Sequence, residues 1–143
     1  MMQNPTSGAE APPIKVVVVT LDNHLASAAD RAAQSLTEKY PGLELAFHAA
    51  ADFGASEERL AQCRADIAAG DIIVANMLFL EDHIQAVLPA LSDRAPHCDA
   101  IVGSMSGPEI VRLTRLGDLD MGAPQGGLMK ALKKLRGGAG KDP

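Results

Sequence analysis

The feature that most constrains this sequence is the run of β-branched residues at 14–20, IKVVVVT. A continuous apolar run of this kind is typical of a strand covered on both faces, as in parallel sheets flanked by helices. An amphipathic stretch with helical spacing follows over 22–40, with Asp22 as a possible N-cap, and Pro41 and Gly42 end it. These two elements predict one strand-and-helix unit of an α/β fold.

The same alternation continues along the chain. Three further strands are predicted over 43–48, 71–75 and 99–103. Strands that alternate with helices form parallel sheets covered on both sides, because each crossover packs a helix against the sheet. The sequence therefore predicts an α/β fold of flavodoxin/Rossmann-like type, a three-layer sandwich with a mainly parallel four-stranded sheet.

Helix signals fill the intervals between these strands. Ser56 is a candidate cap for a second helix, and a third presents apolar residues from Leu80 to Leu91. Ser106 and Glu109 form a capping-box pattern that predicts a helix continuing to Leu116. A last amphipathic helix is predicted over 128–136, with apolar positions at Leu128, Leu132 and Leu135. We expect a single domain over 14–136, with flexible tails at 1–13 and 137–143.

Composition excludes several classes of protein. With 143 residues, 47% of them hydrophobic, the chain has the size and balance of one globular domain. No apolar run approaches the roughly 20 residues of a membrane span, and no secretory signal is visible. The net charge of −5 and the absence of Trp argue against nucleic-acid binding. Cys63 and Cys98 are isolated, which suits a reducing, cytoplasmic environment.

Polar residues gather after the predicted strands, where ligands bind in open α/β sheets. We call this predicted edge the rim, and its candidate binding residues are Asp22, His24, Asn76, Glu81, Asp82, His83, Ser104 and Ser106. Carboxylates and imidazoles are ligands for divalent metals, so His24, Glu81 and His83 are the candidates for a metal site.

Each of these residues also has a purely structural explanation. Asp22 and Ser106 suit helix caps, and Glu81 and Asp82 suit the first turn of a helix, where the dipole favours acids. His48 follows the second strand and could simply bond a neighbour, and His97 precedes the fourth strand at the opposite edge. The sequence has no GxGxxG, phosphate-loop or GxSxG motif.

Longer stretches resemble one known family. KVVVVTLDNH at 15–24, HAAADF at 48–53, DIIVANMLFLEDHIQAVLPAL at 71–91, HCDAIVGSMSGPEIVRLTRLGDLDM at 97–121 and LMKALKKLRG at 128–137 resemble the N-terminal domain of the magnesium chelatase H subunits and their cobaltochelatase relatives. The segment APQGG at 123–127 departs from the family pattern.

This resemblance implies a part in (bacterio)chlorophyll biosynthesis for photosynthesis. The whole enzyme is a ligase that inserts Mg²⁺ into protoporphyrin IX, with ATP used on AAA+ partner subunits. The resemblance implies a non-catalytic domain with no tightly bound cofactor, which contributes to porphyrin handling or docks the rest of the H subunit and the AAA+ subunits. Two alternatives stay open: a small self-contained α/β chelatase that uses His24 or His83 with Glu81, and a structural or regulatory interaction module.

Overall fold

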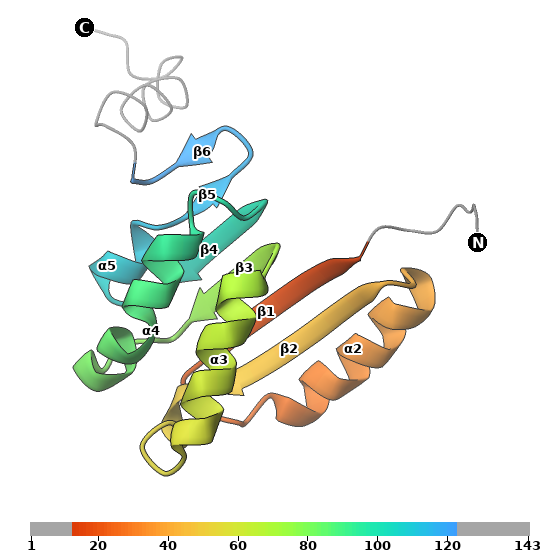
Figure 1. Ribbon diagram of the computed structural model, residues 1–143, viewed down its shortest axis with the longest axis horizontal. Helices are drawn as coiled ribbons and strands as arrows, with labels where there is room; N and C mark the ends of the chain where they lie inside the picture. The colour runs from red at the N-terminus through yellow and green to blue at the C-terminus, as the bar shows by residue number, and fades with distance from the viewer. Residues whose placement is uncertain (1–12, 123–143) are drawn as a thin grey trace, which may run out of the picture.

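The computed structural model describes residues 13–122, which form one mixed β-sheet flanked by helices (Figure 1). The sheet has the strand order β2-β1-β3-β4-β5-β6. Its strands are β1 (Ile14–Thr20), β2 (Leu43–Ala49), β3 (Ile72–Asn76), β4 (Ala100–Ser104), β5 (Arg115–Leu116) and β6 (Leu119–Asp120). The first four in chain order are parallel, while β5 and β6 pair antiparallel at the β4 edge.

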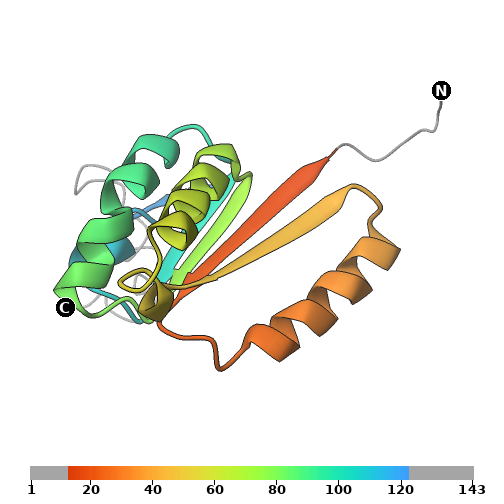
Figure 2. The same cartoon turned by 60° about the horizontal axis from the view of Figure 1, so that its bottom comes forward.

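Helices connect the parallel strands and lie on both sides of the sheet (Figure 2). They are α2 (Ala26–Lys39), the 3-10 turn η1 (Ala50–Asp52), α3 (Glu57–Ala69), α4 (Glu81–Arg94) and α5 (Pro108–Val111). Helix α2 lies on one side, and α3 and α4 lie on the other. This arrangement confirms the predicted α/β fold with three layers.

One side of the sheet, which we call the closed face, forms the hydrophobic core. Its strand residues are fully or almost fully buried: Val17, Val19, Ile73, Ala75 and Ile101. They pack against apolar side chains of the covering helices: Cys63, Ile67, Ile84, Val87, Leu91 and Ile110. Burial of this aliphatic surface is the dominant favourable term in folding.

The opposite side, which we call the open face, is less well covered. Its residues alternate with those of the closed face and are only half-buried: Val16, Val18, Ile72, Val74 and Val102. Helix α2, the one helix on this side within residues 13–122, packs beside β2 and contains no buried residue. The prediction that these strands are buried on both faces is therefore confirmed for the closed face and wrong for the open face within residues 13–122.

The sequence located the four long strands correctly, to within one residue at each end. Within residues 13–122 the sheet nevertheless has six strands rather than four, because the chain folds into a short hairpin, β5–β6, after α5. The helix predicted from Ser106 to Leu116 is wrong for the same reason: α5 ends at Val111, and Leu116 lies in β5.

Two of the three predicted caps are also wrong. Helix α2 begins only at Ala26, without a side-chain cap, so Asp22 lies outside it. Helix α5 has Gly107 at its N-cap, and Ser106 bonds elsewhere. The cap at Ser56 is confirmed, since its Oγ accepts a hydrogen bond from the Arg59 amide at 3.2 Å.

Other predictions fall on residues outside 13–122. The helix over 128–136, the C-terminal tail and all but the last residue of the N-terminal tail belong to this group, and the extent of the domain stays a prediction. Within the described residues, no helix combines the length and hydropathy needed to cross a bilayer.

Candidate functional site

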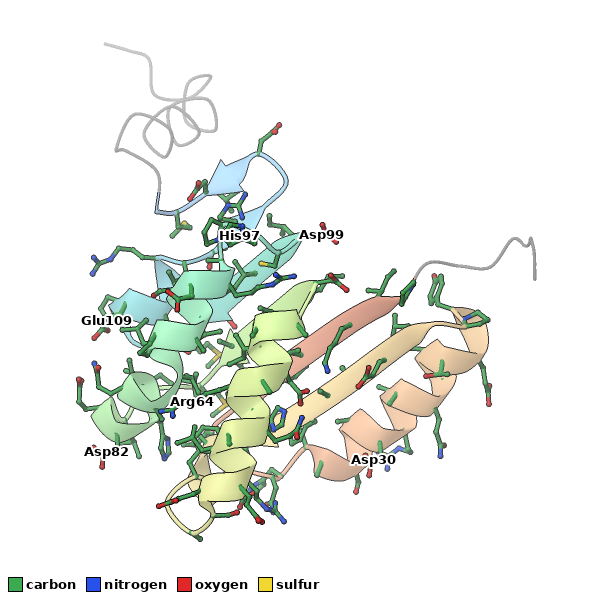
Figure 3. All side chains as sticks on the ribbon, in the orientation of Figure 1. Asp30, Arg64, Asp82, His97, Asp99 and Glu109 are labelled. Atoms are coloured by element: carbon green, nitrogen blue, oxygen red, sulfur yellow. The ribbon has the colours of Figure 1, made fainter. Side chains whose placement is uncertain are left out.

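The rim lies where the parallel strands end. In Figure 3, Asp82 marks this edge, while His97 and Asp99 lie at the opposite edge, as predicted for His97. Asp22 and His24 follow β1, Asn76 ends β3, and Ser104 ends β4. The parallel register places Asn76 directly beside Ser104. The sheet thus brings predicted site residues from separate parts of the chain to one edge.

Three predicted rim residues join the β3–α4 loop to the β4–α5 loop. Ser104 Oγ donates to Asn76 Oδ1 at 3.0 Å. Ser106 Oγ donates to the Ser104 carbonyl at 2.9 Å and accepts from the Leu78 amide at 3.0 Å. The Gly107 amide completes the connection by donating to the Leu78 carbonyl at 2.9 Å. These polar side chains therefore hold the two loops together, and their hydroxyls are engaged within the protein.

The joined loops present apolar side chains to solvent. Phe79 is 53% exposed, Leu80 is 56% exposed and Met105 is 66% exposed. Met77 and Met105 have positive φ angles of 61° and 47°, a region that residues with a Cβ seldom occupy. Strained backbone of this kind costs on the order of 1–3 kcal/mol and is concentrated at functional sites. We call Phe79, Leu80 and Met105 the apolar rim patch.

The acidic and imidazole groups of the rim make local contacts. His24 Nδ1 lies 3.0 Å from Asp22 Oδ1, and both side chains are accessible to solvent. Glu81 accepts a hydrogen bond from Gln85 on its own helix. His83 Nδ1 is buried and has no hydrogen-bond partner among the described residues. Within residues 13–122, no three His, Cys, Asp or Glu side chains form a group that could hold a metal ion. Metal binding at His24, Glu81 or His83 stays a prediction.

A polar network between α3 and the strands β1 and β2 was not predicted from the sequence. Asp66, which is 7% exposed, lies 2.8 Å from Lys15 Nζ and 2.7 Å from His48 Nε2, and Gln62 donates to it at 3.0 Å. Burial alone would raise the pKa of Asp66, but the hydrogen bonds from Lys15, His48 and Gln62 outweigh it and lower that pKa. The same contact with Asp66 raises the pKa of Lys15.

The sequence does contain a signal for this network. Lys15 interrupts a run of β-branched residues, and Asp66 lies beside Ile67 among the buried positions of α3. Charged residues at core positions are rarely tolerated without partners. A lysine and an aspartate in separate apolar patterns therefore indicate an ion pair, although only the fold shows that they meet.

The network borders a cavity of about 410 Å³ at the β2 edge of the sheet. Alanines of α2 and the side chains of Leu45 and Phe47 supply its apolar walls, and His48, Gln62 and the Arg59–Asp52 ion pair supply polar groups. The volume of this cavity is within the range of small-molecule sites, although polar groups make up more of its lining than apolar ones. Since Asp66 accepts from His48 Nε2, the imidazole is held in one orientation.

Comparison with known proteins shows the family to which this chain belongs. Residues 15–143 match a family model described as a domain of unknown function, DUF3479. The chain belongs to the DUF3479 family. This DUF3479 domain is 47% identical over 137 residues to the magnesium-chelatase H subunit of Cereibacter sphaeroides, a match that covers 95% of this chain and 12% of that protein.

A second relative gives the same result. The magnesium-chelatase H subunit of Rhodobacter capsulatus is 44% identical over 122 residues, which is 85% of this chain and 10% of that protein. These matches confirm the resemblance to the N-terminal domain of the magnesium chelatase H subunits that the motifs indicated. The DUF3479 domain thus spans about a tenth of the length of the curated relatives that it matches.

Proposed function

We propose that this domain acts within magnesium chelatase as a non-catalytic contact domain whose rim docks the remainder of the H subunit or the partner subunits. The observation that carries the proposal is the apolar rim patch. Three large side chains on two joined loops are more than half exposed. Exposed apolar groups rimmed by polar ones are typical of protein interaction sites.

The hydrogen bonds among Asn76, Ser104 and Ser106 support this role. They fix the relative positions of the two loops, so that the patch is organised before a partner arrives. A preorganised surface loses less conformational entropy on binding than a mobile one. Strain at Met77 and Met105 has the same implication, because backbone angles of this kind persist only where the surroundings impose them.

The charge of the rim favours a protein partner over a free porphyrin. Glu81 and Asp82 follow Leu80 directly in the chain, and Asp22 follows β1 at the same edge of the sheet. The carboxylates of protoporphyrin IX would meet these acidic groups with like charge. A protein surface with basic residues around an apolar centre would complement the same rim. We infer that docking is the main role and that porphyrin handling is the second candidate, favoured by the exposed aromatic ring of Phe79.

The docking role is tested in an H subunit that carries this domain. We expect Phe79→Ser with Met105→Ser to weaken chelatase assembly at least tenfold, about 1.4 kcal/mol. Leu116→Ser is the matched control, because Leu116 is 54% exposed but lies in the β5–β6 hairpin.

Glu81→Gln with His83→Gln should weaken assembly without a large loss of stability. Unchanged assembly of both rim variants would rule out docking at the rim.

Porphyrin handling is tested by titration of protoporphyrin IX with the purified 143-residue chain, followed by the porphyrin's own absorbance because the chain contains no Trp. Saturable binding near micromolar, about 8 kcal/mol, that is lost in Phe79→Ser would support the second candidate. Lack of binding would leave docking as the function. ATP-independent magnesium insertion by the chain alone would contradict the non-catalytic role.

A further inference from the structure

The outer edge of strand β2 opens into the cavity that α2 and α3 border. Within residues 13–122, β2 is the first strand of the sheet and pairs only with β1, with α2 on one side and α3 on the other (Figure 2). Neighbouring residues of a strand point to opposite faces, yet both Phe47 and His48 line this cavity of about 410 Å³. The cavity therefore reaches both faces of β2 and includes the backbone edge between them.

Two residues of β2 direct their backbone groups to this edge. The Ile14 amide donates to the Gly42 carbonyl at 3.0 Å, and Ile14 pairs with Leu43 in the register, so the even-numbered residues of β2 bond to β1. Leu45 and Phe47 are odd-numbered, so their N–H and C=O groups face outward. No hydrogen bond to these outward groups lies within residues 13–122. They offer two donors and two acceptors in the arrangement that one further strand would bond.

We propose that the β2 edge binds an extended segment of a partner protein, which adds to the sheet as an outer strand next to β2. In this mode of recognition, main-chain hydrogen bonds supply affinity and alternate side-chain pockets supply specificity. The contact goes beyond the docking role of the rim and does not depend on it, because β1 separates β2 from β3 and β4, whose loops carry the apolar rim patch.

The two sides of the cavity would receive different side chains. On the α2 side, Leu45 and Phe47 lie opposite alanines of the helix, whose short side chains leave room for an apolar residue. On the α3 side, the Glu44 side chain is 66% exposed on its strand, and Asp52 and Gln62 line the cavity. Side chains of an added strand alternate between these two sides. A segment with apolar residues at every second position and basic residues between them therefore fits both.

Charge favours such a partner over a second copy of this chain. Residues 13–122 contain sixteen acidic and eight basic residues, a net charge of −8. Two copies joined edge to edge would bring these like charges together, including the Glu44 side chain of each strand, and like charges on neighbouring strands are destabilising. A segment with basic residues would instead be attracted to this surface.

Binding of a model peptide to the 143-residue chain tests the β2 edge. The probe is a capped hexapeptide of alternating lysine and valine, and its matched control has the same side chains and charge but N-methylated backbone amides, which cannot donate hydrogen bonds. We expect the probe to bind at least tenfold more tightly than the control. It should also slow hydrogen exchange of the Leu45 and Phe47 amides at least tenfold, as measured by NMR. Equal binding of both peptides, or no binding of the probe at millimolar concentration, would overturn the proposal.

A pair of variants places the peptide in the cavity. Ala29→Leu narrows the α2 side of the cavity and should weaken probe binding at least tenfold. Ala28→Leu is the matched control, because it is the same substitution on the exposed side of α2 and should leave binding unchanged. Circular dichroism confirms that both variants keep their helices. Equal binding by the two variants would overturn the proposal. Slow exchange of Leu45 and Phe47 without peptide that is lost on dilution would also overturn it, because a second copy would then occupy the edge.

Discussion

The two faces of this sheet differ in burial although the same strands build both. Ile73 is fully buried on the closed face, whereas its neighbour Val74 is half-buried on the open face. Both residues are β-branched and lie in the same strand, so the strand itself does not cause the difference. The helices do, since α3 and α4 present Ile67, Val87 and Leu91 to the closed face.

Helix α2 shows how side-chain size determines coverage. Its sheet-facing positions include Ala26, Ala29 and Ala33, and these short side chains leave the cavity between the helix and β2. Interiors are close-packed, so a helix that contributes mainly methyl groups buries little surface and has no buried residue itself. The comparison teaches that an apolar strand indicates a potential core face, and the facing helix decides whether that face is filled.

The largest expected effect comes from truncation on the closed face. Ile73→Ala should lower the free energy of unfolding by about 4 kcal/mol, because it removes buried methyl groups and leaves a cavity. Val74→Ala should cost only about 1 kcal/mol, since it removes fewer atoms from a partly buried site. Urea unfolding of the two variants measures both values. Equal losses would show that the two faces are packed alike.

The buried charge network comes next. Asp66→Asn should cost about 3 kcal/mol at neutral pH, because it leaves Lys15 charged and poorly compensated beside the closed face. Asp93→Asn is the control, an exposed carboxylate on α4. A loss no greater than that of the control would mean that the network adds little to stability.

The lowered pKa of Asp66 predicts that the stability of the fold depends on pH. Since the folded pKa of Asp66 is lowered, its contribution to stability is fully present above its unfolded pKa, near 4, and is lost as the pH falls through the lower folded value. Thermal unfolding between pH 6 and pH 2 should therefore show a steeper acid limb in the natural chain than in Asp66→Asn. Parallel curves would contradict the lowered pKa.

A smaller effect is expected from overpacking the closed face. A Cβ at Gly103 would clash with the Ile110 carbonyl oxygen, so Gly103→Ala forces α5 away from β4. We expect a loss of about 2 kcal/mol. Gly54→Ala is the control, because a Cβ at that position meets nothing within 4 Å. Differential scanning calorimetry of both variants should show a lower Tm for Gly103→Ala alone.

The last prediction concerns the rate at which a buried thiol is labelled, and it involves no change in stability. Burial raises the pKa of Cys63, on the closed-face side of α3, to about 12. At pH 8 a thiol reagent should therefore label it about a thousandfold more slowly than an ordinary thiol. Ala28→Cys, on the exposed side of α2, supplies the comparison within the same chain. Rapid labelling of Cys63 without denaturant would show that the closed face opens readily.

The candidate site could be predicted only in part from the sequence. The strand ends identify the rim residues, because all parallel strands end at the same edge of the sheet. Asn76 and Ser104 are hydrogen-bonded to each other at that edge. The role of Ser106 was misjudged, since a capping pattern describes local bonding, whereas its hydroxyl bonds the Leu78 amide 28 residues away. The exposure of Phe79 and Met105 could not be predicted, because apolar residues after a strand are usually buried.

The sequence by itself determined the elements and their order, because the period of apolar residues reports which face of each strand or helix avoids water. The sequence also indicated the family, since several long stretches of it resemble the N-terminal domain of the magnesium chelatase H subunits. Only the tertiary structure showed which face of the sheet is covered by large apolar side chains, that Lys15 pairs with Asp66, and that the β5–β6 hairpin forms the edge of the sheet. These outcomes depend on contacts between residues far apart in the chain, whose free energies no local pattern contains.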